Sequence, residues 1–146
     1  MNIIIKNRFT SEVIVEGEYE SIKDCVEKNK FILDSADLTD TDLTDADLTD
    51  ASLIRANLTG ANLTGANLTE ASLIRANLRN ANLRSANLID ADLRSADLRS
   101  ANLIDANLRS ANLINANLRS ANPRGAEITA TQKGDLLKSI GIDIQE

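Results

Sequence analysis

The apolar positions of this chain recur every five residues over most of its length. Residues 31–130 divide into 20 consecutive units of five, such as ANLRS and ADLTD. The central position of each unit is Leu without a gap from Leu33 to Leu118. Ala stands two positions before it, except that Phe31 and Thr41 take its place in the first and third units. The other three positions of each unit are mostly polar or turn-forming.

Neither a helix nor a simple strand is consistent with this period. Five residues advance a helix by about 500°, so successive Leu residues would step round it by about 140° and share no face. Strict alternation also fails, because it would be broken at every fifth residue. Within a unit, however, Ala and Leu are two residues apart and point the same way on an extended chain. Each unit therefore predicts a short extended side followed by a corner.

Four such units close a square coil if each corner turns the chain through about a right angle. The pattern then predicts coils of 20 residues that stack at the strand spacing of about 4.8 Å, with five coils forming a rod about 24 Å long. Ala and Leu would fill the interior, while backbone groups pair with the coils above and below. The sequence thus predicts an all-β solenoid.

The units resemble the signature of the pentapeptide repeat family, A-(D/N)-L-x-x, over about two-thirds of the chain. The resemblance implies a right-handed quadrilateral β-helix, with the central Leu and the preceding Ala facing inward and the other three positions facing solvent. Pro123 and Ile128 depart from the signature in the last two units. Because proline has no backbone donor, we expect an irregular last coil at Pro123.

The two flanking segments have different patterns. NIIIK at 2–6 and EVIVE at 12–16 are β-rich runs on either side of NRFTS, and they predict a hairpin. SIKDCVEKNK at 21–30 predicts a short helix, in which Ser21 and Asp24 resemble a capping box and Ile22, Cys25 and Val26 share a face.

The C-terminal stretch predicts a second short helix that ends at Gly141. We therefore predict three segments: an N-terminal cap at 1–30, the repeat β-helix at 31–130, and a C-terminal helical cap at 131–146. Some members of the family dimerise through a C-terminal helix. The sequence leaves a monomer and such a homodimer equally open.

Charge is uneven along the predicted rod. Residues 31–75 contain 8 acidic and 2 basic side chains, whereas residues 76–125 contain 4 acidic and 7 basic ones, within a net charge of −6 for the chain. Six aspartates occupy outward positions of a single coil: Asp37, Asp40, Asp42, Asp45, Asp47 and Asp50. This cluster is typical of a solvated face with turn-forming residues at its corners. Its spacing does not match known calcium-binding loops, so no metal is expected.

A second interpretation of the acidic cluster follows from the family resemblance. Several family members mimic a DNA rod and bind DNA gyrase, which makes gyrase a candidate partner. Such mimicry requires negative charge along the whole rod, and the basic later units depart from that pattern.

Residues 20 apart should stack in columns. Two columns are candidate interaction surfaces: an arginine column of Arg79, Arg99 and Arg119, and an isoleucine column of Ile54, Ile74 and Ile114. Arg94 interrupts the isoleucine column, which runs beside Arg55 and Arg75. An apolar stripe can mark a partner site, and β-branched residues also suit a strand surface that has no partner. The arginines could receive an acidic partner or phosphates, or extend into water. No aromatic residue stands among them to stack bases, which disfavours nucleic acid.

The residues offer no catalytic site and no cofactor site. The chain has no His, and its single Cys25 is expected to pack against the core rather than react. No signal peptide and no apolar run of membrane length is evident, so we predict a cytoplasmic protein. The sequence favours a non-catalytic module that presents charged columns to an unidentified protein partner. A gyrase-directed DNA mimic and a nucleic-acid binder using the later arginines are the alternatives.

Overall fold

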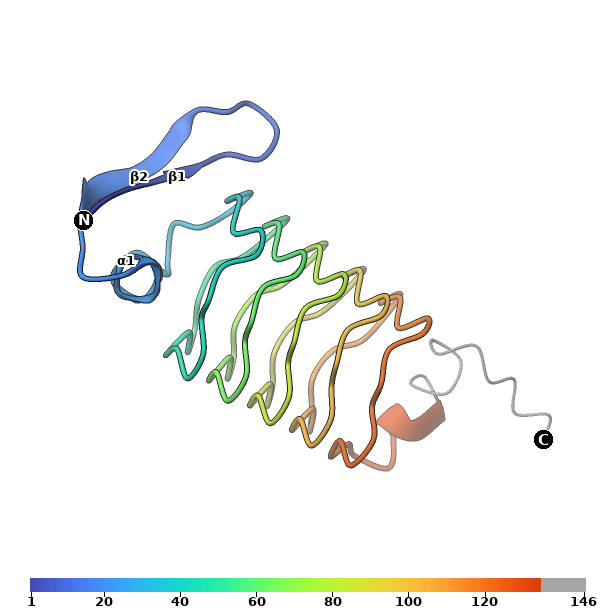
Figure 1. Cartoon of the computed structure of the whole chain (residues 1–146). Helices are drawn as coiled ribbons and strands as arrows, with labels where there is room; N and C mark the ends of the chain where they lie inside the picture. The colour runs from blue at the N-terminus through green and yellow to red at the C-terminus, as the bar shows by residue number, and fades with distance from the viewer. Residues whose placement is uncertain (135–146) are drawn as a thin grey trace.

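The computed structural model describes residues 1–134 as a short N-terminal segment followed by a stack of coils (Figure 1). The N-terminal segment contains an antiparallel hairpin, β1 (Asn2–Lys6) and β2 (Val13–Glu18), and then one helix, α1 (Ile22–Lys28). The hairpin and the helix lie where the sequence predicts them. Strand β2 begins one residue later and ends two residues later than the predicted run at 12–16.

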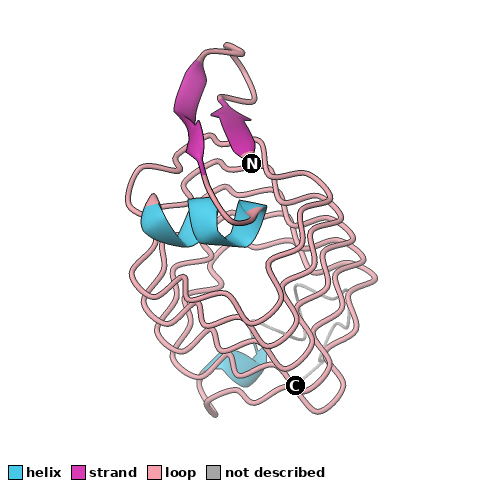
Figure 2. Ribbon diagram, turned by 60° about the vertical axis from the view of Figure 1, so that its left-hand side comes forward, coloured by secondary structure: helices cyan, strands magenta, loops and turns pink. Residues whose placement is uncertain are grey.

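Each coil contains 20 residues and has four sides. Parallel bridges join residue i to residue i+20 along the stack, from Asp37 with Asn57 to Asn107 with Glu127. The bridged residues recur every five positions, so four bridges fall within each coil. The chain turns after every bridge, which is why the stack consists of isolated bridges rather than long strands (Figure 2). The predicted 20-residue coil is confirmed.

All five backbone N–H groups of a typical unit find acceptors. In the unit at residues 76–80 they donate in order to Leu73 O, Ala56 O, Asp97 O, the Asn77 side-chain Oδ1 and Arg99 O, over 2.8–3.2 Å. The bonds to Ala56 O, Asp97 O and Arg99 O join neighbouring coils, and the bond to Leu73 O closes the corner. The remaining bond is accepted within the unit, by the side chain of its own second residue, Asn77. The Asn or Asp at the second position is therefore part of the coil, because its side chain accepts from a backbone donor two residues later.

The last residue of each unit turns the corner with a left-handed backbone. From Ser35 to Gly125 the φ angle at this position lies between 54° and 72°. Asp, Asn, Ser and Gly occupy most of these corners, and Gly, Asn and Asp adopt this conformation at low cost. Arg55, Glu70 and Arg75 are the exceptions, with φ between 58° and 59°.

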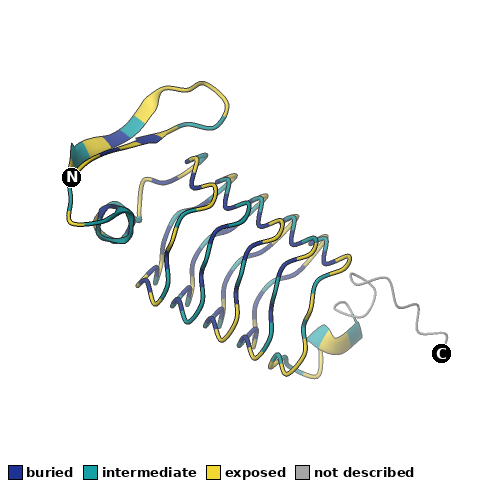
Figure 3. Ribbon diagram, in the orientation of Figure 1, coloured by how far each residue is buried: buried dark blue, intermediate teal, exposed yellow. Residues whose placement is uncertain are grey.

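The inward side chains form one continuous core. Every central Leu from Leu33 to Leu118 is at most 6% exposed, and most of the preceding Ala residues are equally buried. No polar or charged residue is buried in the described part of the chain, and the buried positions recur at regular intervals along every coil (Figure 3). Since burying a Leu side chain is worth about 2 kcal/mol, each coil contributes a similar apolar increment. The predicted inward positions are confirmed.

Residues 1–30 supply hydrogen-bond acceptors to the first coil, which has no coil above it. Three of its exposed donors are satisfied in this way: Asp37 N by Lys6 O, Asp47 N by the Glu27 Oε1, and Ser52 N by Lys30 O, each at 2.8 Å. Helix α1 lies across this end of the stack (Figure 2). These contacts are what a solenoid end requires, because open ladder groups invite further stacking.

Helix α1 begins with the predicted N-cap. The Ser21 Oγ accepts from Asp24 N at 3.1 Å. The reciprocal half of the capping box is absent, since the Asp24 carboxylate accepts from Glu20 N at 3.2 Å instead of from Ser21 N. Cys25 and Val26 are fully buried, and burial raises the pKa of the Cys25 thiol. Cys25 is thus a packing residue, as expected.

The expected irregularity at Pro123 is wrong. The bridges Asn102 with Asn122 and Asn107 with Glu127 continue past it, and Ala126 N donates to Pro123 O at 3.0 Å. In earlier coils the central N–H donates to the following coil, as Leu103 N does to Asn122 O. No further coil follows Pro123 within residues 1–134, so its missing donor interrupts no ladder bond.

The described chain ends in a single helical turn at residues 132–134. The remainder of the predicted C-terminal helix, and the dimer contact suggested for it, fall outside the described residues. No helix between residues 1 and 134 is long and apolar enough to cross a membrane.

Candidate functional site

The six aspartates of the acidic cluster all lie in the first coil with exposed side chains, but they form two structural groups. Asp37, Asp42 and Asp47 occupy second positions and accept from the backbone. The Asp42 Oδ1, for example, accepts from Thr44 N at 3.1 Å and from the Thr44 hydroxyl at 2.6 Å. The threonine hydroxyls hold the pKa of all three carboxyls below the ordinary aspartate value. Half of the cluster therefore stabilises its own corners.

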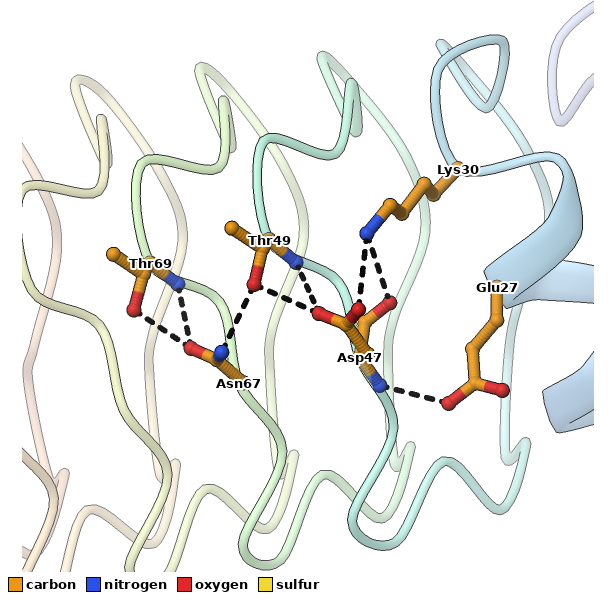
Figure 4. A network of polar contacts seen from close by, with 6 residues as sticks. All are labelled: Glu27, Lys30, Asp47, Thr49, Asn67 and Thr69. Atoms are coloured by element: carbon orange, nitrogen blue, oxygen red, sulfur yellow. Dashed lines mark hydrogen bonds and ion pairs between the residues drawn. The ribbon is translucent and has the colours of Figure 1, made fainter.

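These bonds continue from coil to coil as a polar ladder (Figure 4). The Asn67 Nδ2 donates to the Thr49 Oγ1 at 2.9 Å, and Thr49 in turn donates to the Asp47 Oδ1 at 2.7 Å. At the top of the ladder the Lys30 ammonium lies 3.3 Å from the Asp47 Oδ2. The charge of Asp47 is thus compensated within the chain, which reduces what it can offer to a partner.

Asp40, Asp45 and Asp50 occupy the corners. A Cβ atom placed on Gly60 would collide with the Asp40 Oδ1, so the Asp40 carboxylate lies over the glycine of the next coil; Asp45 lies over Gly65 in the same way. No group of three or more His, Cys, Asp or Glu side chains in residues 1–134 is arranged to hold a metal ion. The six aspartates are instead spread along the outside of the coil as exposed charges.

The arginine column is present, but its middle member, Arg99, is neutralised by an ion pair. Arg99 bonds bidentately to Asp97, with Nε to Oδ1 at 2.8 Å and Nη2 to Oδ2 at 2.6 Å. This contact holds the pKa of the Asp97 carboxyl below its ordinary value. Arg79 and Arg119 are exposed, and neither is in an ion pair with another described residue. Among residues 1–134, the two ends of the column are therefore its members without an ion pair.

The isoleucine column lines a shallow groove of about 660 Å³ that runs along one corner of the rod. Its walls are the last two residues of five stacked units, from Asp34 and Ser35 to Ile114 and Asn115. Ile54 and Ile74 are half-buried in it, and Ile114 is 55% exposed. The structure thus brings all three predicted isoleucines together in one surface feature.

The backbone carbonyls of the groove isoleucines are already used by the fold. The carbonyls of Ile54, Ile74 and Ile114 already accept from the coil above, with N to O distances of 2.8–2.9 Å. Within residues 1–134 the Ile74 N–H and the Arg75 carbonyl make no hydrogen bond, so the groove is apolar in its isoleucine side chains and only partly satisfied in its backbone. A partner would be recognised mainly by shape and charge.

The charges along the groove are unequal. Arg94 is engaged by Asp92, whose Oδ2 lies 2.6 Å from its Nη2, and Asp34 accepts from Ile54 N at 3.2 Å. Arg55 and Arg75 are exposed and take part in no ion pair with any other residue in the range 1–134. The groove consequently combines three isoleucines with two uncompensated guanidinium groups.

A further cation stands at the edge of the groove. The Arg8 Nη1, from the loop that follows β1, donates to Arg55 O and Ala56 O at 3.3 Å each. This contact places positive charge beside the N-terminal half of the groove. The sequence carries no signal for this contact, because Arg8 lies outside the repeats.

Arg55 and Arg75 flank the isoleucine column but are not among the residues that the sequence predicts for the site. The sequence does carry a signal for them. The octapeptide ASLIRANL occurs at 51–58 and again at 71–78, one coil apart, so the two copies stack directly. Arginine also stands there at a corner that is elsewhere mostly Asp, Asn, Ser or Gly.

The family model for pentapeptide repeats matches residues 32–69, 61–99 and 101–131, with eight copies. No curated protein is significantly similar to the chain. A solved pentapeptide repeat protein of the Arabidopsis thaliana thylakoid lumen is 31% identical, over 70% of this chain and 75% of that one, with a TM-score of 0.62.

Two other solved structures are more distant in shape. The pentapeptide repeat protein Rfr23 of the cyanobacterium Cyanothece 51142 is 36% identical, with a TM-score of 0.46; the match covers 64% of this chain and only 57% of Rfr23. QnrB1, a plasmid-mediated fluoroquinolone resistance protein, is 16% identical over 77% of this chain and 68% of its own, with a TM-score of 0.32.

The family match implies that the four-sided coil is a right-handed quadrilateral β-helix. From its repeats and its structural relatives, the chain belongs to the pentapeptide repeat family.

Proposed function

We propose that this chain is a non-catalytic protein-interaction module, a rigid rod whose partner docks in the groove along the isoleucine column. The observation that carries the proposal is the groove itself, in which Ile54, Ile74 and Ile114 share one surface with Arg55 and Arg75. Exposed apolar stripes rimmed by polar residues are typical of interaction sites. Proteins of this family are generally structural or interaction modules.

The coil architecture supports this role. Inward positions are used for the core, and second positions are mostly used for the backbone. The fourth residue of each unit is therefore the freest to vary in chemistry, and the last one varies within the limits of its left-handed corner. Their side chains repeat at fixed intervals along a stiff ladder.

We propose residues 31–130 as the repeat domain and residues 1–30 as its N-terminal cap. We also propose that the protein is cytoplasmic.

The gyrase-directed DNA mimic is less well supported by the charge distribution. Mimicry needs uncompensated negative charge along the rod. Here Asp47 is paired with Lys30, and the later coils carry mainly arginine. Nucleic-acid binding through the arginine column is weakened by the pairing of Arg99 with Asp97. Neither alternative uses the isoleucines.

The proposal is tested by comparing two pairs of substitutions at the same position of the repeat unit. Ile54→Ser with Ile74→Ser alters the groove, while Ile89→Ser with Ile104→Ser alters other sides of the coil. Proteins that the immobilised chain retains from a cell extract would be purified, and their affinity for each variant measured in solution. We expect the groove pair alone to lose binding. Equal binding by both variants would overturn the proposal.

A further inference from the structure

We infer that the groove takes an extended, acidic segment of a partner protein, in which apolar side chains alternate with carboxylates. This inference rests on the proposed function and specifies the chemistry of the partner. It depends on three properties of the groove: its length and depth, the two adjacent columns that line it, and the residues that occupy its corners.

The dimensions favour an extended chain over a helix. From Asp34 to Ile114 the groove crosses five coils, a length of about 19 Å at 4.8 Å per step, which an extended segment covers in about six residues. A helix of that length with its side chains is about 10 Å wide and occupies about 1,500 Å³. The groove offers about 660 Å³, which is closer to the roughly 900 Å³ of an extended segment of the same length, taken from strand spacings of about 4.8 and 10 Å.

Two adjacent columns match the alternation of an extended chain. Ile54 and Ile74 precede Arg55 and Arg75 directly in sequence, so an apolar column and a basic column run side by side along the rod. Successive side chains of an extended segment point to opposite sides. A segment lying between the columns would direct apolar side chains to one and carboxylates to the other, and the planar guanidinium fork suits a carboxylate.

The two arginines are unfavourable for the fold itself. They hold left-handed corners with φ of 59° and 58°, a conformation that costs a side chain without Asn or Asp chemistry about 1 kcal/mol. They also stack one coil apart, where like charges repel. Residues that break a local rule without a structural return are expected at functional sites. An acidic occupant would relieve the repulsion between Arg55 and Arg75.

The probe for the test is a synthetic seven-residue peptide with alternating Glu and Val, blocked at both ends and labelled with fluorescein. Its binding to the full chain is followed by fluorescence anisotropy. Two control peptides carry Ser in place of Val or Lys in place of Glu. We expect saturable binding of the alternating peptide, about tenfold weaker binding of the Ser peptide, and no binding of the Lys peptide.

The matching protein variants are Arg55→Glu with Arg75→Glu, and Arg84→Glu with Arg124→Glu as a control on another side of the coil. Glu70 already holds an equivalent corner with φ of 59°, so the first pair is compatible with the fold, which circular dichroism would verify. We expect the first pair to weaken peptide binding at least about tenfold and the control pair to change it less than about twofold.

Three results would overturn the inference. One is no saturable binding of the alternating peptide; another is equal binding of the Ser peptide, which would reduce the site to charge alone. The third is displacement of the peptide by duplex DNA through the same arginines, which would make the groove a polyanion site. If a purified partner still depends on Ile54 and Ile74 while no acidic peptide binds, only this inference fails. If the partner does not depend on them either, the proposed function fails as well.

Discussion

At the scale of single residues, each position of the five-residue unit has its own physical task. Ala and Leu fill the interior, and the sequence predicts this because their spacing is visible in the period. The task of the second position is not visible in the same way. Asp37, Asp42 and Asp47 look like surface charge in the sequence, yet their carboxylates accept from backbone donors. A period shows which face a residue occupies, but not which donor its side chain reaches.

The left-handed corner at Gly60 leads to the first prediction. Gly60→Ala should lower the free energy of unfolding by about 1–2 kcal/mol, because its φ of 69° disfavours a Cβ atom. Gly60→Asn should cost less, since Asn80 holds the same corner one coil later. Guanidinium denaturation measures both.

The Asp40 carboxylate that lies over Gly60 provides a control. It is the end of a flexible side chain, so we expect it to move aside and contribute little of the cost. The penalty of Gly60→Ala should persist when Asp40 is replaced by Gly. Its disappearance in that background would show that the clash, not the backbone, is responsible.

The second prediction concerns acid stability. The threonine hydroxyls hold the pKa of Asp37, Asp42 and Asp47 below the ordinary value in the folded chain, which is about 3.9 in an unfolded one. The stability contributed by these carboxylates is therefore fully present above that value and is lost as pH falls through the folded pKa. The triple Asp→Asn variant keeps the acceptor oxygen and removes the titration.

Denaturation midpoints measured between pH 5 and pH 2 test this expectation. The stability of the triple variant should fall less steeply with acid than that of the original chain. Parallel curves for the two proteins would mean that the threonine hydrogen bonds do not favour the charged form.

At the scale of the elements, the hairpin, the helix and the coils follow from patterning, but their junctions do not. The first coil is completed by Lys6, Glu27 and Lys30, and none of these contacts has a signature in the sequence. Pro123 shows the same limit at the other end. Because proline lacks a backbone N–H, the sequence predicts a disturbed coil there. The proline lies in the last described coil, however, where its missing N–H interrupts no hydrogen bond between coils.

This position leads to the third prediction. Leu103 lies one coil above Pro123, and its N–H donates to Asn122 O at 2.9 Å. Leu103→Pro should cost about 3 kcal/mol or more, because it removes a ladder bond and a buried side chain. Pro123→Leu should change the free energy of unfolding by less than about 1 kcal/mol, since Pro123 is only half-buried. Similar costs for both changes in denaturant titrations would contradict the explanation of the last coil.

At the scale of the whole molecule, the rod is acidic in its first coils and basic in its later ones. The sequence predicts this asymmetry and the isoleucine column, because both follow from counting in steps of 20. It does not predict that Arg94 and Arg99 are neutralised by Asp92 and Asp97, since either arginine could equally extend into water. These two ion pairs lie within the later coils, so they take Arg94 and Arg99 out of the free cationic surface but leave the charge asymmetry of the rod in place. The groove is distinctive because it combines isoleucines with Arg55 and Arg75.

The measurement that tests this account most directly is site-specific photo-crosslinking in cells. A photoreactive phenylalanine would replace Ile74 in the groove or, as the matched control, Ile89, which is also half-buried and has the same place in its unit. We expect a discrete crosslinked protein from position 74 that is absent from position 89 and is lost when Arg55 and Arg75 are changed to Glu. Equal crosslinking from both positions, or none from position 74, would contradict it.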